Sequence, residues 1–420
     1  MKKMLLYNVK SNSVTITFLI LCTFFIIVSK QPAAFILTEI VSRLDRNAIL
    51  ILSLLVPVLC GMGLNFSLCI GAMAGEIGLL FITHMHIDGI PGMLAAFSIA
   101  TVLGILFGYL TGLLFNKTKG QEMITGMILG FFSLGLFDLT FIYLMGSIIP
   151  LKSPEMMLDT GVGFRNTIEF RAGTKQVIDK LWAMPLADCL LYLFAIFFLV
   201  LVAKTAYQML KNKKPFKSTL KVKELALFAI VGSVVVLSKV NLTFKFLLAF
   251  TVIPVASFIL IGLVCLLIVF ITRTKLGHDI ETVGQNMHVA SSAGINVNRT
   301  RIISIIISTV IAGWGQIMYL QNIGNINTYS SHEQVGTYAI AALLVGGASI
   351  TKATIPQVFI GTILFHILFF ISPLAGKALF NDPLIGEYFR QSVCYGVIAV
   401  ALALYAWQIV ARKKKELEEA

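Results

Sequence analysis

The chain has 420 residues, of which 57% are hydrophobic and only 13% are charged, and its formal net charge is +13. Soluble domains carry about a quarter charged residues, so this composition excludes an ordinary soluble protein and indicates a polytopic membrane protein. The lysines and arginines lie in short loops beside apolar runs and form no basic stripe with interleaved aromatics, so we expect no nucleic-acid partner.

The N-terminal region begins with lysines and continues as the apolar run 14–29. No small-residue cleavage site follows this run, so we expect a retained first span with its tail in the cytoplasm. The next segment, 29–47 (SKQPAAFILTEIVSRLDRN), is amphipathic, and we expect it to lie along the outer surface of the membrane. Its basic residues are an exception to the positive-inside rule.

Apolar runs long enough to cross a bilayer recur along the rest of the chain. Two of them join at 61–75 (GMGLNFSLCIGAMAG), where the glycines favour a broken or closely packed helix. We expect an all-α polytopic membrane protein with about twelve transmembrane helices in a single domain over residues 1–420. The expected spans are 14–29, 47–65, 67–83, 91–115, 121–145, 185–206, 224–240, 246–272, 302–321, 336–350, 354–372 and 391–411.

Basic residues set the expected orientation, because they favour the cytoplasmic side. They lie at the N-terminus, around Lys117, in the lysine-rich loop 204–223, and after the last span from Arg412 to Lys415. With these groups in the cytoplasm, both termini are cytoplasmic and the number of spans is even. The loop 147–184 mixes acidic and basic residues and is then the main extracytoplasmic loop.

Sequence patterns of catalysis and metal binding are missing from this chain. There is no P-loop, no H-E-x-x-H pattern and no spacing that nominates a nucleophile with its base. The stretch THMHIDG holds only His84, His86 and Asp88 in one loop, which is a weak metal pattern. We therefore expect no catalytic residue and no metal site, and a role in transport or anchoring.

The polar stretch 284–301 (GQNMHVASSAGINVNRTR) lies between two long spans. Within it, residues 285–293 favour a short helix that offers Met287, Val289 and Ala290 as apolar contacts. Gly284 and Gly294 are expected to bound this helix, with Gly294 in the left-handed region that ends helices. The alternative is a solvated loop whose short helix has no partner.

Residues 274–299 (TKLGHDIETVGQNMHVASSAGINVNR) resemble the cytoplasmic segment of membrane subunits of ATP-binding-cassette importers, of the type II-like branch that serves ribose, nucleosides and branched-chain amino acids. A second stretch, 339–350 (AIAALLVGGASI), and the third, 61–75, are similar to further segments of that family. Met287 and Ser291 replace the acidic residue and the arginine that are usual there. The matching positions are Thr274, Gly277, Gly284, Asn286, Gly294, Ile295, Asn296 and Val297.

The resemblance implies that 274–301 is a cytoplasmic coupling loop whose short helix docks on a partner ATPase. It implies a permease subunit of an ATP-driven importer for a small polar solute such as a sugar or nucleoside. The family core has about ten spans, so the hairpin 185–240 is expected to be an addition. The coupling residues so implied are Gly284, Asn286, Met287, Val289, Ala290, Gly294 and Ile295.

The resemblance also implies the partners. These are two ATPase subunits, a second permease that is a copy or a sister chain, an extracytoplasmic substrate-binding protein, and membrane lipid. The chain itself is expected to bind no cofactor, because ATP and Mg belong to the ATPases. The expected location is the bacterial cytoplasmic (inner) membrane.

Ionisable residues inside spans cost about 2.5–3.5 kcal/mol and are functional candidates by default. We name Glu76 and His366 as candidates for the translocation pathway, together with Asn65 and Ser67 of the broken helix. Each of them could instead be satisfied by neighbouring helices. The alternative function is an ion-coupled secondary transporter that uses Glu76 or Asp138. Gly346 and Gly347 are expected to permit tight turning and close helix packing beside the inner gate.

Overall fold

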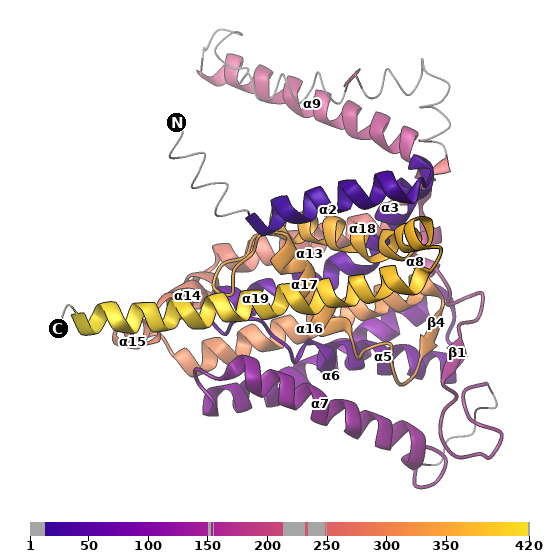
Figure 1. Cartoon of the computed structure of the whole chain (residues 1–420), viewed down its shortest axis with the longest axis horizontal. Coiled ribbons are helices and arrows are strands. Elements are labelled where there is room, and N and C mark those ends of the chain that lie inside the picture. Colours follow the sequence, from indigo (N-terminus) through magenta and orange to yellow (C-terminus); the bar gives the residue numbers. More distant parts are fainter. Residues whose placement is uncertain are drawn as a thin grey trace. The chain divides into compact units, whose positions relative to one another are not determined.

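A computed structural model of the chain describes residues 13–149, 153, 155–212, 232, 233, 248 and 250–418 (Figure 1). Contacts divide the chain into two compact units. The first comprises residues 1–30, 42–178 and 257–420, and the second comprises 31–41 and 179–256. The predicted span 224–240 lies almost wholly outside the described residues, as does the basic loop 204–223 beyond residue 212.

The described secondary structure is almost entirely helical, which confirms the predicted all-α polytopic class. Among the described residues, five helices are long and apolar enough to cross a membrane, and shorter apolar helices accompany them. The long ones are α6 (Gly89–Lys117), α7 (Glu122–Leu139) with its π-helical extension η1 (Thr140–Leu144), α13 (Val255–Arg273), α16 (Val297–Ile323) and α18 (Ile355–Phe380). The shorter apolar helices are α2 (Ser13–Ser29), α5 (Leu68–His84), α17 (Val335–Val345) and the first part of α9 (Leu186–Asn212). Helix α19 (Pro383–Glu418) is a longer helix outside both groups.

Helix α3 (Ala33–Leu52) differs from the sequence prediction. The predicted boundary at residue 47, between a surface segment and a span, is wrong. No glycine or proline interrupts the chain between Ala33 and Leu52, so one helix continues through the boundary. Its last turn, Ala48–Leu52, is buried. Arg43 and Arg46 precede this turn on the same helix, and both belong to the first unit.

The predicted broken helix near 61–75 is present. Helix α4 (Leu55–Leu59) ends before the break, and α5 begins after it at Leu68. Gly61 and Gly63 both have φ of +73°, a left-handed conformation that favours glycine. The remainder of the predicted stretch is regular helix, so the break itself spans about eight residues, Cys60 to Ser67.

In the core of the first unit, the three helices α5, α6 and α16 pack against one another. Small residues allow this close approach. On α5, a methyl group added to Gly75 would lie 2.3 Å from the carbonyl oxygen of Gly313. On α6, glycines recur every fourth residue and face the backbone of α16 at Val310, Ile306 and Ile302; they are Gly104, Gly108 and Gly112.

The segment 153–178, within the predicted extracytoplasmic loop, is folded onto this unit. Strand β1 (Thr167–Glu169) pairs antiparallel with β4 (Asn325–Asn327), with Ile168 opposite Ile326. Apolar side chains of the segment, among them Met156 and Phe164, join the core formed by α5, α6, α7 and α16. The loop therefore fixes the position of β4, at the end of α16.

The second unit holds a short two-stranded ribbon. Strand β2 (Ala183–Pro185) pairs antiparallel with β3 (Val252–Pro254), with Met184 opposite Ile253. The ribbon joins the start of α9 to the chain before α13. Of the predicted extra hairpin 185–240, only residues 185–212, 232 and 233 are described.

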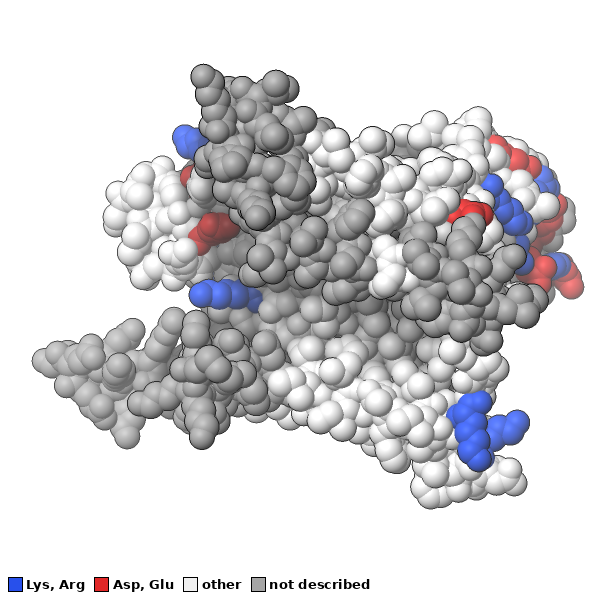
Figure 2. Space-filling model, turned by 90° about the horizontal axis from the view of Figure 1, so that it is seen from above, with Lys and Arg blue, Asp and Glu red and all other residues white. Residues whose placement is uncertain are grey.

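In the view of Figure 2, acidic and basic side chains gather in a few clusters and leave most of the described surface uncharged. This is the distribution expected of helices that cross a bilayer. The protein is thus a multi-pass membrane protein.

Candidate functional site

Two short helices, α14 (Lys275–Gln285) and α15 (Met287–Ser292), follow the apolar helix α13. Asn286 separates them and caps α15, because its Oδ1 accepts hydrogen bonds from the backbone N–H groups of His288 at 2.8 Å and Val289 at 3.2 Å. Gly294 follows α15 with φ of +82°, the left-handed conformation that the sequence predicted. Asn296 then caps α16 by accepting from the N–H of Arg299.

The position of Gly284 differs from its prediction. It does not bound α15 but lies in the last turn of α14, where a methyl group would sit 2.0 Å from the carbonyl oxygen of Leu59. The residue is glycine because α14 contacts the backbone just before the helix break.

Helix α15 presents one face to solvent and the other to its own chain. Val289 is 58% exposed, and His288, Ser291 and Ser292 are exposed beside it. Ala290 is fully buried, so the expectation that it offers a contact to a partner is wrong. Met287 and Ile295 are partly buried against the same apolar cluster as Ala290. They fix α15 in place, which leaves Val289 as the exposed apolar side chain of this helix.

Arg301, in the first turns of α16, holds α15 against two membrane helices. Its guanidinium donates to Glu122 Oε1 at 2.5 Å, Asn116 Oδ1 at 2.9 Å and the carbonyl oxygen of Phe115 at 3.0 Å. Its fourth contact is the sulfur of Met287 on α15, at 3.5 Å. The side chains of Arg301 and Glu122 are 1% and 8% exposed. This buried, fully hydrogen-bonded pair joins α15, α16, α6 and α7 at one end of the unit.

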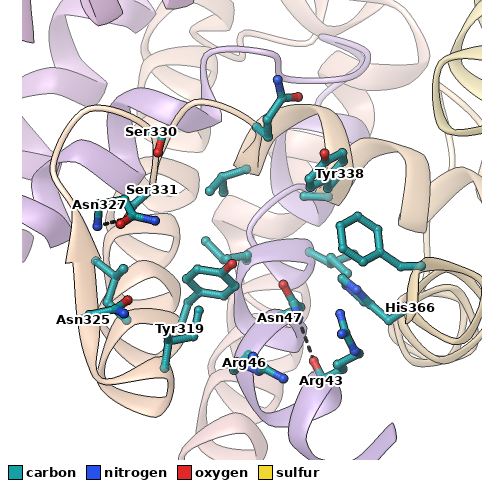
Figure 3. A pocket seen from close by; sticks show the side chains of 18 residues that line it. Arg43, Arg46, Asn47, Tyr319, Asn325, Asn327, Ser330, Ser331, Tyr338 and His366 are labelled. Carbon is teal, nitrogen blue, oxygen red and sulfur yellow. Dashed lines mark hydrogen bonds between the residues drawn. The ribbon is translucent and has the colours of Figure 1, made fainter. Parts of the chain in front are cut away.

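A cavity of about 280 Å³ lies in the first unit, at the opposite end of α16. Because β4 contributes to its rim and pairs with the segment predicted to be extracytoplasmic, the cavity lies on the predicted outer side. Its walls come from α3, α16, β4, α17 and α18 (Figure 3). A single helix, α16, therefore runs from the end that contacts α15 to the cavity, and its 27 residues span about 40 Å.

The lining combines aromatic rings with polar groups. Tyr319, Tyr338 and Phe369 supply the rings, and those of Tyr338 and Phe369 meet edge to face with centroids 5.2 Å apart. Arg43 lies over the Phe369 ring, 5.5 Å from its centroid. No acidic side chain is among the described residues that line the cavity. The polar lining consists of Arg43, Arg46, Asn47, Asn325, Asn327, Ser330, Ser331, Gln334 and His366.

Of the four predicted pathway residues, His366 lines this cavity. Its side chain comes from α18, it is 5% exposed, and its Nδ1 has no hydrogen-bond partner among the described residues. Asn65 and Ser67 lie elsewhere, at the helix break. The amide oxygen of Asn65 accepts from the Ser67 hydroxyl at 2.5 Å, and its Nδ2 donates to the hydroxyl of Ser308 on α16 at 3.4 Å. These two residues are buried and tie the break to α16.

Glu76 is fully buried and does not line the cavity. Its Oε2 lies 2.8 Å from Nδ1 of His332, a residue that sequence reasoning did not single out. The His332 ring also packs against Phe137, with centroids 4.4 Å apart. His332 belongs to the segment between β4 and α17 that carries Ser330 and Ser331. The pair therefore anchors part of the cavity rim to α5.

Gly346 and Gly347 end α17. A methyl group on Gly346 would lie 2.0 Å from the carbonyl oxygen of Gln357, so this glycine permits the close contact between α17 and α18. Gly347 has φ of +86° and its carbonyl oxygen accepts from the Gln357 side chain at 2.8 Å. Tight turning and close packing are present as predicted. Proximity to a gate stays a prediction.

The cavity residues of α3 were missed by sequence reasoning, although a signal existed. Arg43 and Arg46 lie on the predicted outer side, against the positive-inside rule, and a charge in that position needs a local reason. For His332 the only signal was the need of a buried Glu76 for a partner, and nothing in the sequence indicated which residue supplies it.

Comparison with known proteins adds to this geometry. The model of the family of branched-chain amino acid transport system permease components matches residues 46–402. The chain is 36% identical over 91 residues to the nucleoside ABC transporter permease protein NupB of Lactococcus lactis, which covers 21% of the chain and 25% of that protein. It is 29% identical over 257 residues to the guanosine ABC transporter permease protein NupQ of Bacillus subtilis, covering 60% of the chain and 72% of the relative.

A further relative is the autoinducer 2 import system permease protein LsrC of Klebsiella pneumoniae, which is 31% identical over 84 residues, or 20% of the chain and 24% of the relative. The chain thus spans about a quarter of NupB and of LsrC and nearly three quarters of NupQ. No solved structure matches the chain.

Proposed function

The chain belongs to the family of branched-chain amino acid transport system permease components, and from this membership we propose that it is the membrane-spanning subunit of an ATP-driven importer for a small polar solute. The match over residues 46–402 is the observation that carries the proposal. It includes both the coupling segment and the cavity. Members of this family are translocation subunits rather than enzymes.

The coupling role rests on α14 and α15. A partner that hydrolyses ATP acts on a permease only through a contact, and α15 offers an exposed face with Val289 at its centre. Behind that face, Arg301 and the buried side chain of Ala290 attach α15 to α16, α6 and α7. A displacement imposed on α15 is therefore passed to membrane helices.

The solute class rests on the cavity and on the relatives together. Aromatic rings beside amides, hydroxyls and guanidiniums suit a solute with a flat ring and several hydrogen-bonding groups. Permeases for guanosine and other nucleosides are among the relatives. We take a nucleoside or a solute of similar chemistry as the cargo.

The remaining parts of the proposal follow from the family. The chain works with two ATPase subunits that hold ATP and Mg, with a second permease, and with an extracytoplasmic binding protein. It lies in the cytoplasmic membrane of a bacterium, with both termini in the cytoplasm. The lysine-rich loops support this orientation.

The test uses the full chain expressed with its partner ATPase, measuring co-purification of the ATPase and ATP-driven nucleoside uptake. Val289→Asp places a desolvated charge in the proposed contact, and we expect it to reduce ATPase co-purification at least tenfold and to abolish uptake. Leu158→Asp is the matched control, because Leu158 is 45% exposed in the predicted extracytoplasmic segment; it should leave ATPase co-purification unchanged.

Two results oppose the proposal. If Val289→Asp co-purifies and transports as the parent chain does, α15 is not the coupling contact. If uptake persists after ATP depletion and stops when the ion gradient is dissipated, the chain is a secondary transporter.

A further inference from the structure

Two adjacent residues of α3 present opposite hydrogen-bonding groups to the cavity. Asn47 donates from Nδ2 to the carbonyl oxygen of Arg43 at 2.9 Å, so its amide oxygen remains as an acceptor. Arg46 uses its Nε on the carbonyl oxygen of Ser42 at 3.3 Å, and a guanidinium has further N–H donors on its terminal nitrogens. Figure 3 shows both side chains among those directed at the cavity. The cavity wall thus offers a donor next to an acceptor.

His366 contributes a polar residue to the cavity wall and is 5% exposed. Its Nδ1 has no partner among the described residues but is itself shielded from solvent, so it is not a contact for a ligand in the cavity. The hydrogen-bonding groups that a ligand meets are therefore sought on α3.

Aromatic side chains set the shape of the expected ligand. Tyr319 from α16 and Tyr338 from α17 line the cavity from different elements, and Phe369 supports the Tyr338 ring edge to face. A flat heterocycle can lie against such rings and keep its edge in the plane where hydrogen bonds form. The volume of about 280 Å³ is at the small end for ligand pockets, which suits a single nucleoside.

We propose that Arg46 and Asn47 make this cavity selective for the lactam edge of an oxo-substituted base, in which a ring C=O stands next to a ring N–H. The guanidinium donates to the C=O, and the Asn47 oxygen accepts from the N–H. Guanine, hypoxanthine and uracil carry this edge. Adenine and cytosine carry an amino donor next to a bare ring nitrogen, so both contacts would be mismatched. The inference rests on the proposed function only in assigning nucleosides as cargo.

Inosine and adenosine are the sharpest pair of probes, because they share the ribose and the purine rings and differ in the edge at positions 1 and 6. The experiment measures their binding to the full chain in lipid nanodiscs, without the binding protein, whose own preference would mask that of the cavity. We expect inosine to bind at least tenfold more tightly than adenosine. Guanosine and uridine, as added arms, separate an oxopurine from an oxopyrimidine as the natural base.

Arg46→Gln is the test variant, and it should reduce the inosine-to-adenosine ratio to nearly one. Asn47→Asp keeps the acceptor and should preserve the ratio, whereas Asn47→Leu removes the acceptor and should lower it. Arg299→Gln is the matched control, because Arg299 is an exposed arginine at the other end of α16. Elution as a folded species in gel filtration and an unchanged circular dichroism spectrum establish that each variant is intact.

The inference is overturned if the parent chain binds inosine and adenosine equally, or if Arg46→Gln retains the parent ratio. ATP-driven uptake by the assembled transporter is measured separately. Uptake without an inosine preference in the permease removes this inference and leaves the proposed function standing. An inosine preference without ATP-driven uptake removes the proposed function and leaves this inference standing.

Discussion

Gly61 and Gly284 meet backbone to backbone. A methyl group on Gly61 would lie 2.8 Å from the Cα of Gly284, and one on Gly284 would lie 3.0 Å from the backbone nitrogen of Gly61. Gly61 belongs to the helix break and Gly284 to the last turn of α14. The proposed coupling segment therefore touches the break in the membrane helix directly. Four residues beyond Gly61, Asn65 connects that break to Ser308 on α16.

Gly284→Ala is expected to separate ATP hydrolysis from transport. The added methyl group collides with the carbonyl oxygen of Leu59 at 2.0 Å, so α14 must move away from the break. We predict that the assembled transporter keeps its ATPase activity and loses most of its uptake. Gly135→Ala is the control, because nothing lies within 4 Å of a methyl group there. Parallel loss of assembly and uptake would instead mean that Gly284 serves folding alone.

Arg301→Lys tests the buried ion pair. Lysine keeps the charge but cannot reach Glu122, Asn116 and the Phe115 carbonyl oxygen together, so hydrogen-bonding groups are left unsatisfied. We expect a loss of about 1–3 kcal/mol in the free energy of unfolding. Thermal unfolding in detergent measures it, with Arg299→Lys on the exposed side of the same helix as the comparison. Equal stability of the two variants contradicts the assigned contacts.

Asn286→Ala removes the cap of α15. The N–H groups of His288 and Val289 lose their acceptor, and caps of this kind are worth about 1 kcal/mol. Hydrogen exchange at these amides should accelerate several-fold, whereas exchange in the middle of α16 stays unchanged. Asn286→Ser, which retains an acceptor, should restore most of the protection.

Glu76 and His332 form a buried pair, and either residue without the other is expected to destabilise the fold. Both are fully buried, so removing one partner leaves a polar or charged group without compensation, at a cost of about 3–5 kcal/mol. We expect Glu76→Leu and His332→Leu each to lower the unfolding temperature markedly. The double variant should be more stable than either single variant, because no orphaned group remains. Additive losses in a double-mutant cycle argue against a direct interaction.

Glu155 and Arg171 pair on the exposed segment 153–178, where Arg171 Nη2 lies 2.6 Å from Glu155 Oε1. The hydrogen bond from Arg171 lowers the pKa of Glu155 below its usual value of 4.5. A carboxyl with a lowered folded-state pKa stabilises the fold fully above the unfolded pKa and loses that contribution as the pH falls through the folded pKa. The pair is therefore intact at neutral pH, and its contribution is lost as the pH falls below 4.5 and through the lowered pKa of Glu155.

A ¹³C-NMR titration of labelled glutamate measures this pKa directly. In Arg171→Gln the pKa of Glu155 should rise towards its ordinary value. Arg165→Gln, which removes the neighbouring arginine paired with Asp159, should leave it unchanged. If the pKa of Glu155 is the same in Arg171→Gln as in the parent chain, the two residues do not pair in solution.

The all-α class, the helix break and the left-handed Gly294 were predictable because each depends on local sequence. A run of about 20 apolar residues crosses a bilayer whatever surrounds it, and glycines at 61 and 63 break a helix by their own conformational freedom. The position of α15 was also predictable to within two residues at each end.

The cavity was not predictable from the same information, because it brings together α3, the end of α16, the start of α17 and the middle of α18. The wrong boundary at residue 47 also hid the cavity. It assigned Arg46 to a surface segment, whereas Arg46 lies on α3 and lines the cavity. His332 was missed because its partner Glu76 is 256 positions away in the chain. Such pairings follow from packing and not from spacing.

The glycine contacts also determine which substitutions natural relatives of this chain can accumulate. At Gly75 a side chain would meet the carbonyl oxygen of Gly313, a main-chain atom that no exchange on α16 can remove, so this position should remain glycine across the lineage. At Gly130 the nearest atom to an added methyl group is the sulfur of Cys69, at 3.1 Å. A smaller residue at 69 would relieve that contact, so positions 69 and 130 are expected to diverge together.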